Sequence, residues 1–341
     1  MKRKLYKLAL AGFLLGSVCS CSTEGVIQQI LGASAESPVF LDCRPVSDRE
    51  IVFRFSMPVK LLSLNFDPPI ETGSVEEGRE IKVTFARPLD GGVKMTADIL
   101  VEDSARNSLN VIVPFRTRNE RMPAIVFNEF RFDYSGNSVE FIELKTLGPG
   151  NLGALKLFIA HQSILEPFYE FPPVEVEANK YIVLHTRTKE EGCLDETSGD
   201  SGLSKGIDAK NGAWDFWIPG NKKYLHNTNG FWLMDQDGGI MDALLVCETA
   251  DLSGVTASLA KTFNAAAGFL GGEKAWLPNS GNAGEGWIPS PADAVITKGT
   301  SATKTLCRDE SIAPAPRAAN WYITATSNAT PGVQNSTKRF N

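Results

Sequence analysis

Long stretches of this chain alternate apolar and polar residues, and this alternation restricts the fold more than any other feature. Residues two apart in a strand point to the same face, so alternation predicts strands that bury one face and expose the other. Between residues 38 and 121 the apolar members are Ile51, Phe53, Phe55, Ile81, Val83, Phe85, Val93, Met95, Ala97, Ile99, Val101, Leu109, Val111, Val113 and Phe115. About seven short antiparallel strands in this stretch would form a sandwich.

The length of the chain predicts two domains. It has 341 residues, 43% hydrophobic and 22% charged, which is the composition of an ordinary globular protein. At about 150 residues per domain, a second domain is expected after the first alternating stretch. A different β-rich pattern begins at Met122. We therefore expect an all-β protein with two tandem sandwiches.

The first twenty residues have the pattern of an export signal. Lys2, Arg3, Lys4 and Lys7 give a positive start, residues 8–15 are apolar, and small residues follow. The apolar stretch is shorter than the roughly 20 residues that span a bilayer. We expect residues 1–20 to be a cleaved signal peptide.

The signal ends in Val18-Cys19-Ser20-Cys21, which resembles the lipobox of bacterial lipoproteins. The resemblance implies cleavage before Cys21 and a diacylglycerol on its sulfur, with Cys19 as the alternative attachment site. Residues 21–37 would then be a lipidated tether. We expect a protein of the cell envelope that is anchored to a membrane by lipid and faces the periplasm or the cell surface.

The charge of the chain argues against nucleic-acid binding. The formal net charge is −6, and the signal holds four basic residues and no acidic ones, so the remainder carries −10. Nucleic-acid binding needs a basic surface that attracts phosphates. We expect a protein or glycan ligand instead, with the membrane reached through the lipid.

Four cysteines lie beyond the signal and the anchor. Cys193 and Cys307 have polar sequence neighbours, so we expect them to form a disulfide in an exported protein. Cys43 and Cys247 lie in apolar runs, where a buried thiol is the ordinary outcome. No CxxC pair is present in the sequence, which argues against a zinc site.

Two segments of the first unit resemble bacterial Ig-like domains. The segment Val52-Phe53-Arg54-Phe55-Ser56-Met57-Pro58-Val59 is similar to their second strand. Residues Val101 to Asn107 are similar to their turn of the form v-x-D-x-x-G-N, with Arg106 where Gly is usual. The resemblance covers residues 38–121. It implies an Ig-like sandwich that serves as a spacer or adhesion module.

The second unit, residues 122–335, resembles lamin-tail domains through several motifs in the family's order. The matching segments are 124–130, 139–144, 176–184, 232–243, 305–308, 320–322 and 330–332. Phe141 stands where the family has Trp, and a long insertion separates Val246 from Lys304. The resemblance implies a second Ig-like sandwich.

The insertion in the second unit contains a helical pattern. Its apolar residues recur every three or four positions, which is the spacing of an amphipathic helix. They are Leu252, Val255, Leu259, Phe263, Ala266 and Phe269. We expect a small helix that ends at Gly271-Gly272.

Three short patterns suggest chemistry, and each has a simpler structural interpretation. The segment 148–153 matches the dinucleotide pattern GxGxxG, but its preceding strand carries charges and no helix follows, so a turn is expected. The segment 199–202 resembles the nucleophile loop of trypsin-like proteases without that family's His motif. Asp235, Asp237 and Asp242 are weak candidates for Ca²⁺, because Val246 stands where an EF-hand needs Glu. We expect neither cofactor nor metal.

The expected function is therefore binding rather than catalysis. His161, His185 and His226 are far apart in the sequence. Trp214, Phe216 and Trp217 form an aromatic segment. Such a run is more often part of a core, and where its rings are exposed it is a possible binding surface for sugars or proteins. We expect an envelope scaffold, adhesion or protein-binding module that is not an enzyme. The alternative is an envelope hydrolase or its accessory subunit, since bacterial lamin-tail domains are often joined to hydrolases.

Overall fold

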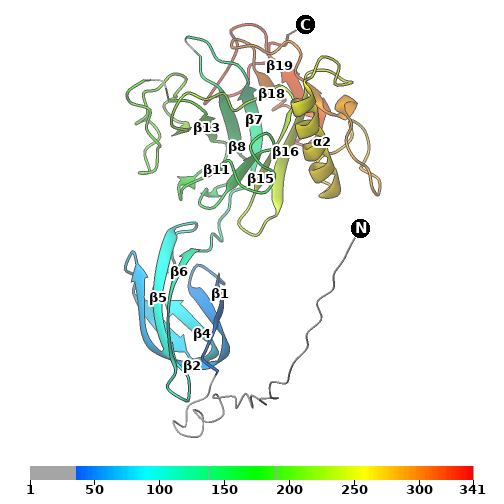
Figure 1. Cartoon of the computed structure of the whole chain (residues 1–341). Helices are drawn as coiled ribbons and strands as arrows, with labels where there is room; N and C mark the ends of the chain where they lie inside the picture. The colour runs from blue at the N-terminus through cyan, green and yellow to red at the C-terminus, as the bar shows by residue number, and fades with distance from the viewer. Residues whose placement is uncertain (1–35, 137, 189, 341) are drawn as a thin grey trace, which may run out of the picture.

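The computed structural model describes residues 36–136, 138–188 and 190–340. The predicted signal peptide, Cys21 and nearly all of the predicted tether lie outside these residues. The described chain is mainly β-sheet, which confirms the all-β prediction. Figure 1 shows two units placed end to end and joined by one short segment. No helix among the described residues has the length and apolar character needed to cross a bilayer.

The first unit consists of six antiparallel strands. They are β1 (Phe40–Pro45), β2 (Glu50–Asp67), β3 (Thr72–Glu76), β4 (Gly78–Phe85), β5 (Lys94–Glu102) and β6 (Ser108–Arg116). The sheet order is β3-β4-β2-β5-β6, and β1 also pairs with β2. The first part of β2 pairs with β4 and its second part with β5. One long strand thus replaces two of the shorter strands that the sequence predicted.

The alternating residues of the first unit form its core as predicted. Ile51, Phe53, Ile81, Val83 and Ile99 are fully buried. In β5 buried residues alternate with half-buried ones, as the pattern predicts, whereas in β2 the intervening Val52 is buried as well. Burial of one face of each strand against the others is the main source of stability for this small unit.

The second unit contains two larger sheets. One has the order β14-β13-β8-β7-β18-β19, and the other has the order β11-β10-β15-β16-β17. Two short strands, β9 and β12, form a separate pair. The bounds are β7 (Ile125–Arg131), β8 (Phe141–Thr146), β9 (Gly150–Asn151), β10 (Lys156–Ile159), β11 (Tyr169–Glu170), β12 (Glu175–Val176), β13 (Tyr181–His185), β14 (Trp214–Trp217), β15 (Asn229–Met234), β16 (Ile240–Cys247), β17 (Val295–Ile296), β18 (Leu306–Arg308) and β19 (Trp321–Ile323). Both sheets contribute to one hydrophobic core.

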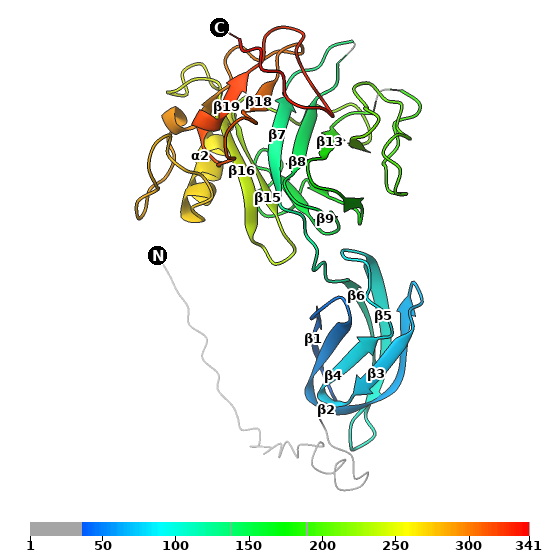
Figure 2. The same ribbon diagram turned by 180° about the vertical axis from the view of Figure 1, so that it is seen from behind.

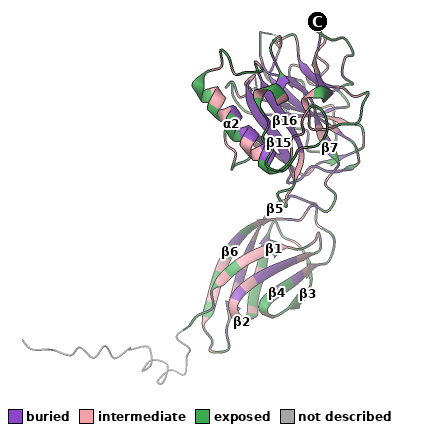
Figure 3. Ribbon diagram, turned by 90° about the vertical axis from the view of Figure 1, so that its right-hand side faces the viewer, coloured by how far each residue is buried: buried purple, intermediate pink, exposed green. Residues whose placement is uncertain are grey.

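The helix predicted in the insertion is α2 (Ala257–Gly272), and it ends where predicted. It begins after Leu252, which has φ of 61° in a turn, and Thr256 caps its first turn by accepting a hydrogen bond from the Leu259 N–H. Figure 3 shows α2 over the buried strands β15 and β16, with its outer face exposed. Close approach requires Gly230 on β15, because a Cβ there would lie 2.4 Å from the Cβ of Ala266.

Candidate functional site

The segment between β6 and β7 is fixed by hydrogen bonds to the second unit. Asn119 is 4% exposed and donates from Nδ2 to the carbonyls of Asn151 and Gly153, both at 2.8 Å. Its backbone N–H donates to Gln236 Oε1, and Gln236 Nε2 donates back to the Asn119 carbonyl, again at 2.8 Å. These four bonds make the junction a defined contact rather than a free linker.

The glycine-rich segment 148–153 contacts the first unit at Gly91 and Gly92. A Cβ on Gly153 would lie 2.0 Å from the carbonyl oxygen of Gly91, and a Cβ on Gly92 would lie 2.4 Å from the carbonyl carbon of Gly153. Gly91 and Gly92 belong to the turn before β5. The pattern that resembled a dinucleotide loop therefore allows two backbones from different units to touch.

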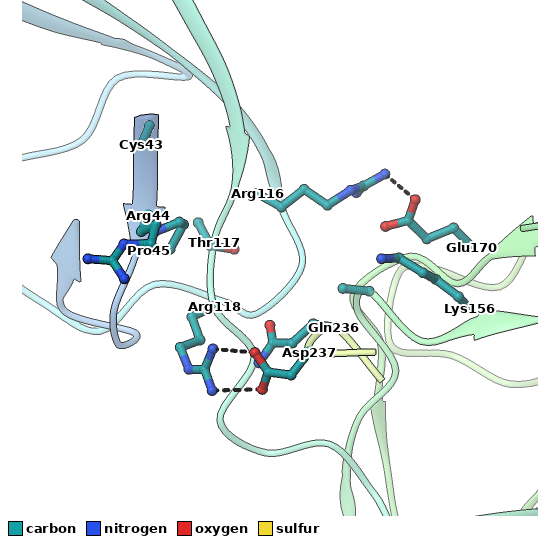
Figure 4. Close-up of a pocket in the computed structure, with 11 residues that line it drawn as sticks. Cys43, Arg44, Pro45, Arg116, Thr117, Arg118, Lys156, Glu170, Gln236 and Asp237 are labelled. Atoms are coloured by element: carbon teal, nitrogen blue, oxygen red, sulfur yellow. Dashed lines mark hydrogen bonds and ion pairs between the residues drawn. The ribbon is translucent and has the colours of Figure 1, made fainter. Parts of the chain in front are cut away.

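A cleft of about 470 Å³ lies beside this contact and is walled by both units. Figure 4 shows side chains from β1 and β6 on one side and from β10, β11 and the β15–β16 turn on the other. The lining residues are Cys43, Arg44, Pro45, Arg116, Thr117, Arg118, Ala154, Lys156, Glu170, Gln236 and Asp237. Four cations and two carboxylates are among them.

Two ion pairs cross the cleft from one unit to the other. Arg116 Nη2 lies 2.7 Å from Glu170 Oε2, and Arg118 binds both oxygens of Asp237 at 2.9 Å each. The hydrogen bond to Asp237 raises the pKa of Arg118 and lowers that of Asp237. The two-pronged pairing orients the units as well as attracting them.

Cys43 also lines the cleft, and its environment keeps it unreactive. Burial, together with the charge of Asp42, raises the pKa of the Cys43 thiol to about 12. Since the thiolate is the nucleophilic form, this cysteine stays protonated near neutral pH. The thiol is half-buried, whereas Cys247 is fully buried as predicted.

The three histidines are placed away from the cleft, although two of them meet. The rings of His161 and His226 lie 4.1 Å apart between centroids, and burial beside His161 and Lys223 lowers the pKa of His226 to about 4. His185 Nε2 lies 2.7 Å from Asp215 Oδ1, with both side chains almost fully buried. Neither pairing has a local signal in the sequence, because the partners are at least 30 residues apart.

The aromatic segment is part of the core, as is usual for such a run, and its rings do not form an exposed binding surface. Trp214, Phe216 and Trp217 are 8%, 0% and 5% exposed on β14. Trp217 stacks on His185 with centroids 3.9 Å apart, and its ring N–H donates to Ser204 Oγ at 3.0 Å. Parallel pairing of β14 with β13 draws the segment into the core of the second unit.

The predicted disulfide is absent, because Cys193 lies in a loop beside β14 and Cys307 lies in β18, at another part of the same sheet. The Cys193 sulfur and the Trp217 ring both flank Gly206, beside β14, whereas Cys307 is buried in β18. The sheet order puts four steps between β14 and β18, each about 4.8 Å. Bridged cysteines have Cα atoms no more than about 7 Å apart. Burial raises the pKa of the Cys307 thiol, which contacts Thr305 Oγ1 at 3.7 Å.

The three aspartates considered for calcium have separate partners. Asp235 closes the β15–β16 turn by accepting from the Asp237 and Gly239 N–H groups, and Asp237 pairs with Arg118. Asp242 is buried in β16 against Arg308. Within the described residues, no group of three or more metal-binding side chains is arranged around a common point.

The buried acids of the predicted lamin-tail motifs form a further cluster. Glu129 and Glu143 are opposite each other on β7 and β8, and both are fully buried. Glu129 accepts from the Thr330 N–H and hydroxyl, and Glu143 accepts from the Gly332 N–H. The opening motif therefore holds the closing Thr330-Pro331-Gly332 motif in place.

Comparisons with known proteins concern the second unit. The family model TP_1001_2nd, described as a protein second domain, matches residues 123–323. A protein of Treponema pallidum (strain Nichols), named "Uncharacterized protein", is 28% identical over 186 residues, which are 52% of this chain and 46% of that protein. The chain thus spans about half the length of this relative.

Proposed function

This chain belongs to the TP_1001_2nd family through its second unit, and we propose that it is a non-enzymatic binding protein of the bacterial cell envelope. The observation that carries the proposal is the charged cleft between the units. Its walls come from two units and hold four cations but no histidine. A cleft of this size accommodates a small ligand or part of a larger one.

The placement of acid–base groups supports binding over catalysis. His185 and Asp215 are 0% and 1% exposed, and Glu129 and Glu143 are both 0% exposed. A general acid or base has to reach its substrate, directly or through one water molecule. These four buried side chains contact other core residues instead. The Cys43 thiol does line the cleft, but its raised pKa keeps it protonated near neutral pH.

The proposed architecture is a bacterial Ig-like sandwich followed by a lamin-tail-like sandwich. The shared strand β2 and the two facing sheets of the second unit support this arrangement, and Figure 2 displays them from behind. The contacts of Glu129 and Glu143 with residues 330–332 support the lamin-tail resemblance, because they join its first and last motifs. Such units commonly act as rigid spacers that present a binding surface.

The proposed location rests on the N-terminal sequence. Residues 1–21 resemble a lipoprotein signal with Cys21 as the lipidated residue. Mass spectrometry of the native protein should detect an N-terminal peptide that begins with acylated Cys21. A mature protein that retains Met1, or begins at another residue without lipid, would contradict the anchor.

The binding function is tested by crosslinking the purified full-length protein to envelope extract. We expect a defined envelope component to be captured by the native protein and lost from Arg116→Ala, which removes the pair with Glu170 across the cleft. Arg121→Ala is the matched control, because Arg121 pairs with Glu175 and does not line the cleft. Equal capture by all three proteins would contradict the proposal.

The alternative function is that of an envelope hydrolase, and the paired rings of His161 and His226 favour it. A hydrolase would release product from envelope polymers, and the activity would disappear in His161→Ala or His226→Ala. Release of product that depends on either histidine would replace the binding proposal with the hydrolase alternative.

A further inference from the structure

The side chains of Asn128 and Lys145 bind the same carboxylate, that of Glu310. Lys145 Nζ pairs with Glu310 Oε2, and Asn128 Nδ2 donates to Glu310 Oε1 at 3.1 Å. The Asn335 N–H and the Tyr181 hydroxyl donate to the same carboxylate at 3.0 and 3.2 Å, which fixes its position. An amine and a carboxamide are therefore held together within the span of one carboxylate, and such positioning favours a reaction between them.

A bulge in β7 brings Asn128 to this place. Lys145 is opposite Val126 and Glu143 is opposite Glu129, whereas Asn128 is the one residue of β7 without an opposite residue on β8. A bulge turns its extra side chain out of the regular alternation. Residues 143 and 145 are two apart in β8 and point to the same face. Asn128 Nδ2 thereby reaches Glu143 Oε1, at 2.7 Å, as well as Glu310.

These groups lie in a nearly dry environment. Asn128 is 1% exposed, and the side chains of Glu310 and Lys145 are 8% and 18% exposed. Within the described residues, Asn128 Oδ1 has no hydrogen-bond partner. A buried polar atom without a partner is rare and is often found where a structure performs chemistry. Exclusion of water also favours attack on the carboxamide by an amine over its hydrolysis.

The two glutamates that contact Asn128 differ in the protonation state they favour. Burial and the charge of Glu129 raise the pKa of Glu143 well above its ordinary value, which favours the protonated acid. Burial also acts on Glu310, but hydrogen bonds from Lys145, Asn335 and Asn128 outweigh it and lower the pKa of Glu310, which favours the carboxylate. Carboxyl groups whose environments separate their pKa values in this way supply one acid and one base.

We propose that Lys145 and Asn128 react to form an amide bond that joins β7 to β8. Glu310 Oε2 takes a proton from the Lys145 ammonium, and the neutral Nζ attacks Cγ of Asn128. Glu143 gives its proton to Nδ2, the Cγ–Nδ2 bond breaks, and ammonia leaves as the Nζ–Cγ bond is completed. A second proton of Nζ returns to Glu143, and the proton on Glu310 passes to the ammonia. One ammonium ion is released, and no oxidant or cofactor is consumed.

The reaction occurs once in each chain and converts no external substrate. The inference is therefore independent of the proposed binding function. An amide bond survives both denaturant and reducing agent, so the two strands would stay joined after the second unit unfolds. This property allows the bond to be detected in denatured protein.

The test is mass spectrometry of purified full-length protein after digestion with trypsin in denaturant. Cleavage after Arg121, Arg131 and Lys145 would give residues 122–131 and 132–145 as separate peptides. An amide on Lys145 blocks cleavage there, so we expect one branched product of residues 122–131 and 132–156, lighter than their sum by one ammonia molecule. Recovery of the two separate peptides from native protein would overturn the proposal. A product that joins Lys145 to Glu310 with loss of water would also overturn it.

Three variants assign the roles of the residues. Lys145→Arg keeps a positive charge beside Glu310 but has no nucleophilic amine, so it should give the separate peptides alone. Lys180→Arg is the matched control, because Lys180 pairs with the exposed Glu177 and its loss should leave the branched product at the native level. Loss of the branched product in Lys180→Arg as well would overturn the assignment to Lys145.

Glu143→Gln tests the acid. Because a general acid typically contributes at least about 100-fold to a rate, we expect freshly synthesised Glu143→Gln to form the branched product at least about 100-fold more slowly than native protein. Formation at the native rate would overturn the role of Glu143 in the reaction. Circular dichroism verifies that each variant is folded.

Discussion

Glu129 on β7 and Glu143 on β8 lie directly opposite each other, and their carboxylates both bind the segment that contains Thr330 and Gly332. Burial raises the pKa of both groups, and the charge of Glu129 raises that of Glu143 further. Hydrogen bonds from the Thr330 and Gly332 N–H groups oppose these shifts without cancelling them. These two acids therefore bind the C-terminal segment of the second unit. Their ionisation in the core lowers the folding stability, and this loss grows as the pH rises.

The first prediction is that the second unit loses stability as the pH rises above the ordinary carboxyl value of 4.5. With a raised pKa in the folded state, the unfolded chain releases its protons first. The stabilisation is full below the unfolded pKa and is lost as the pH rises toward the folded pKa. Each group lowers the unfolding free energy by up to about 1.4 kcal/mol per pH unit. Urea denaturation across this range measures the slope.

Glu143→Gln removes one titrating group and should make that decline shallower. Glu177→Gln is the control, since its side chain is 83% exposed and its loss should leave the profile unchanged. A variant at residue 143 with the native pH profile would mean that other groups dominate the pH dependence.

The second prediction concerns the buried pair of Asp242 and Arg308. The two side chains are 4% and 3% exposed and lie 2.5 Å apart. Asp242→Asn leaves a buried guanidinium without its counter-charge, so we expect a loss of about 3–5 kcal/mol in chemical denaturation. Asp237→Asn breaks the exposed pair with Arg118 and should cost no more than about 1 kcal/mol. Similar losses in the two variants would contradict this assignment of buried and exposed pairs.

The third prediction concerns Trp217, whose ring packs on His185 inside the second unit. Trp217→Ala should lower the unfolding free energy by about 3–5 kcal/mol, because it leaves a large cavity. Trp217→Phe keeps an aromatic face over His185 but loses the hydrogen bond to Ser204, so it should cost less. Thermal denaturation ranks the two variants. Native stability in Trp217→Ala would contradict the burial of this ring.

The sequence was most informative where structure depends on local periodicity. Alternation identified the core residues Ile81 and Val83, and spacing of three and four identified α2. Both patterns arise from how neighbouring residues share a face. The aromatic segment left both a core and a binding surface open, because its burial depends on β13 and on Ser204, which lie outside its own sequence.

The cleft could not be predicted from the sequence, because its lining residues are far apart in the chain. Arg44, Arg116, Lys156 and Glu170 belong to four different strands of two units. Each is unremarkable in its own segment, since charged residues are ordinary on solvent-facing strands. Only the position of the first unit against residues 151–153 brings them together.

The last prediction tests the position of the first unit against the second, by substituting glycines of the segment 148–153. Gly153→Ala would place a Cβ 2.0 Å from the carbonyl oxygen of Gly91, a clash between backbones of the two units. The same change at Gly148 meets nothing nearer than 3.8 Å, and neither glycine has a positive φ. We therefore expect Gly153→Ala to separate the units and increase proteolysis of residues 117–124, while Gly148→Ala behaves as native. Because backbone atoms cannot yield as a flexible side chain does, a native scattering profile in Gly153→Ala would contradict the contact that forms the cleft.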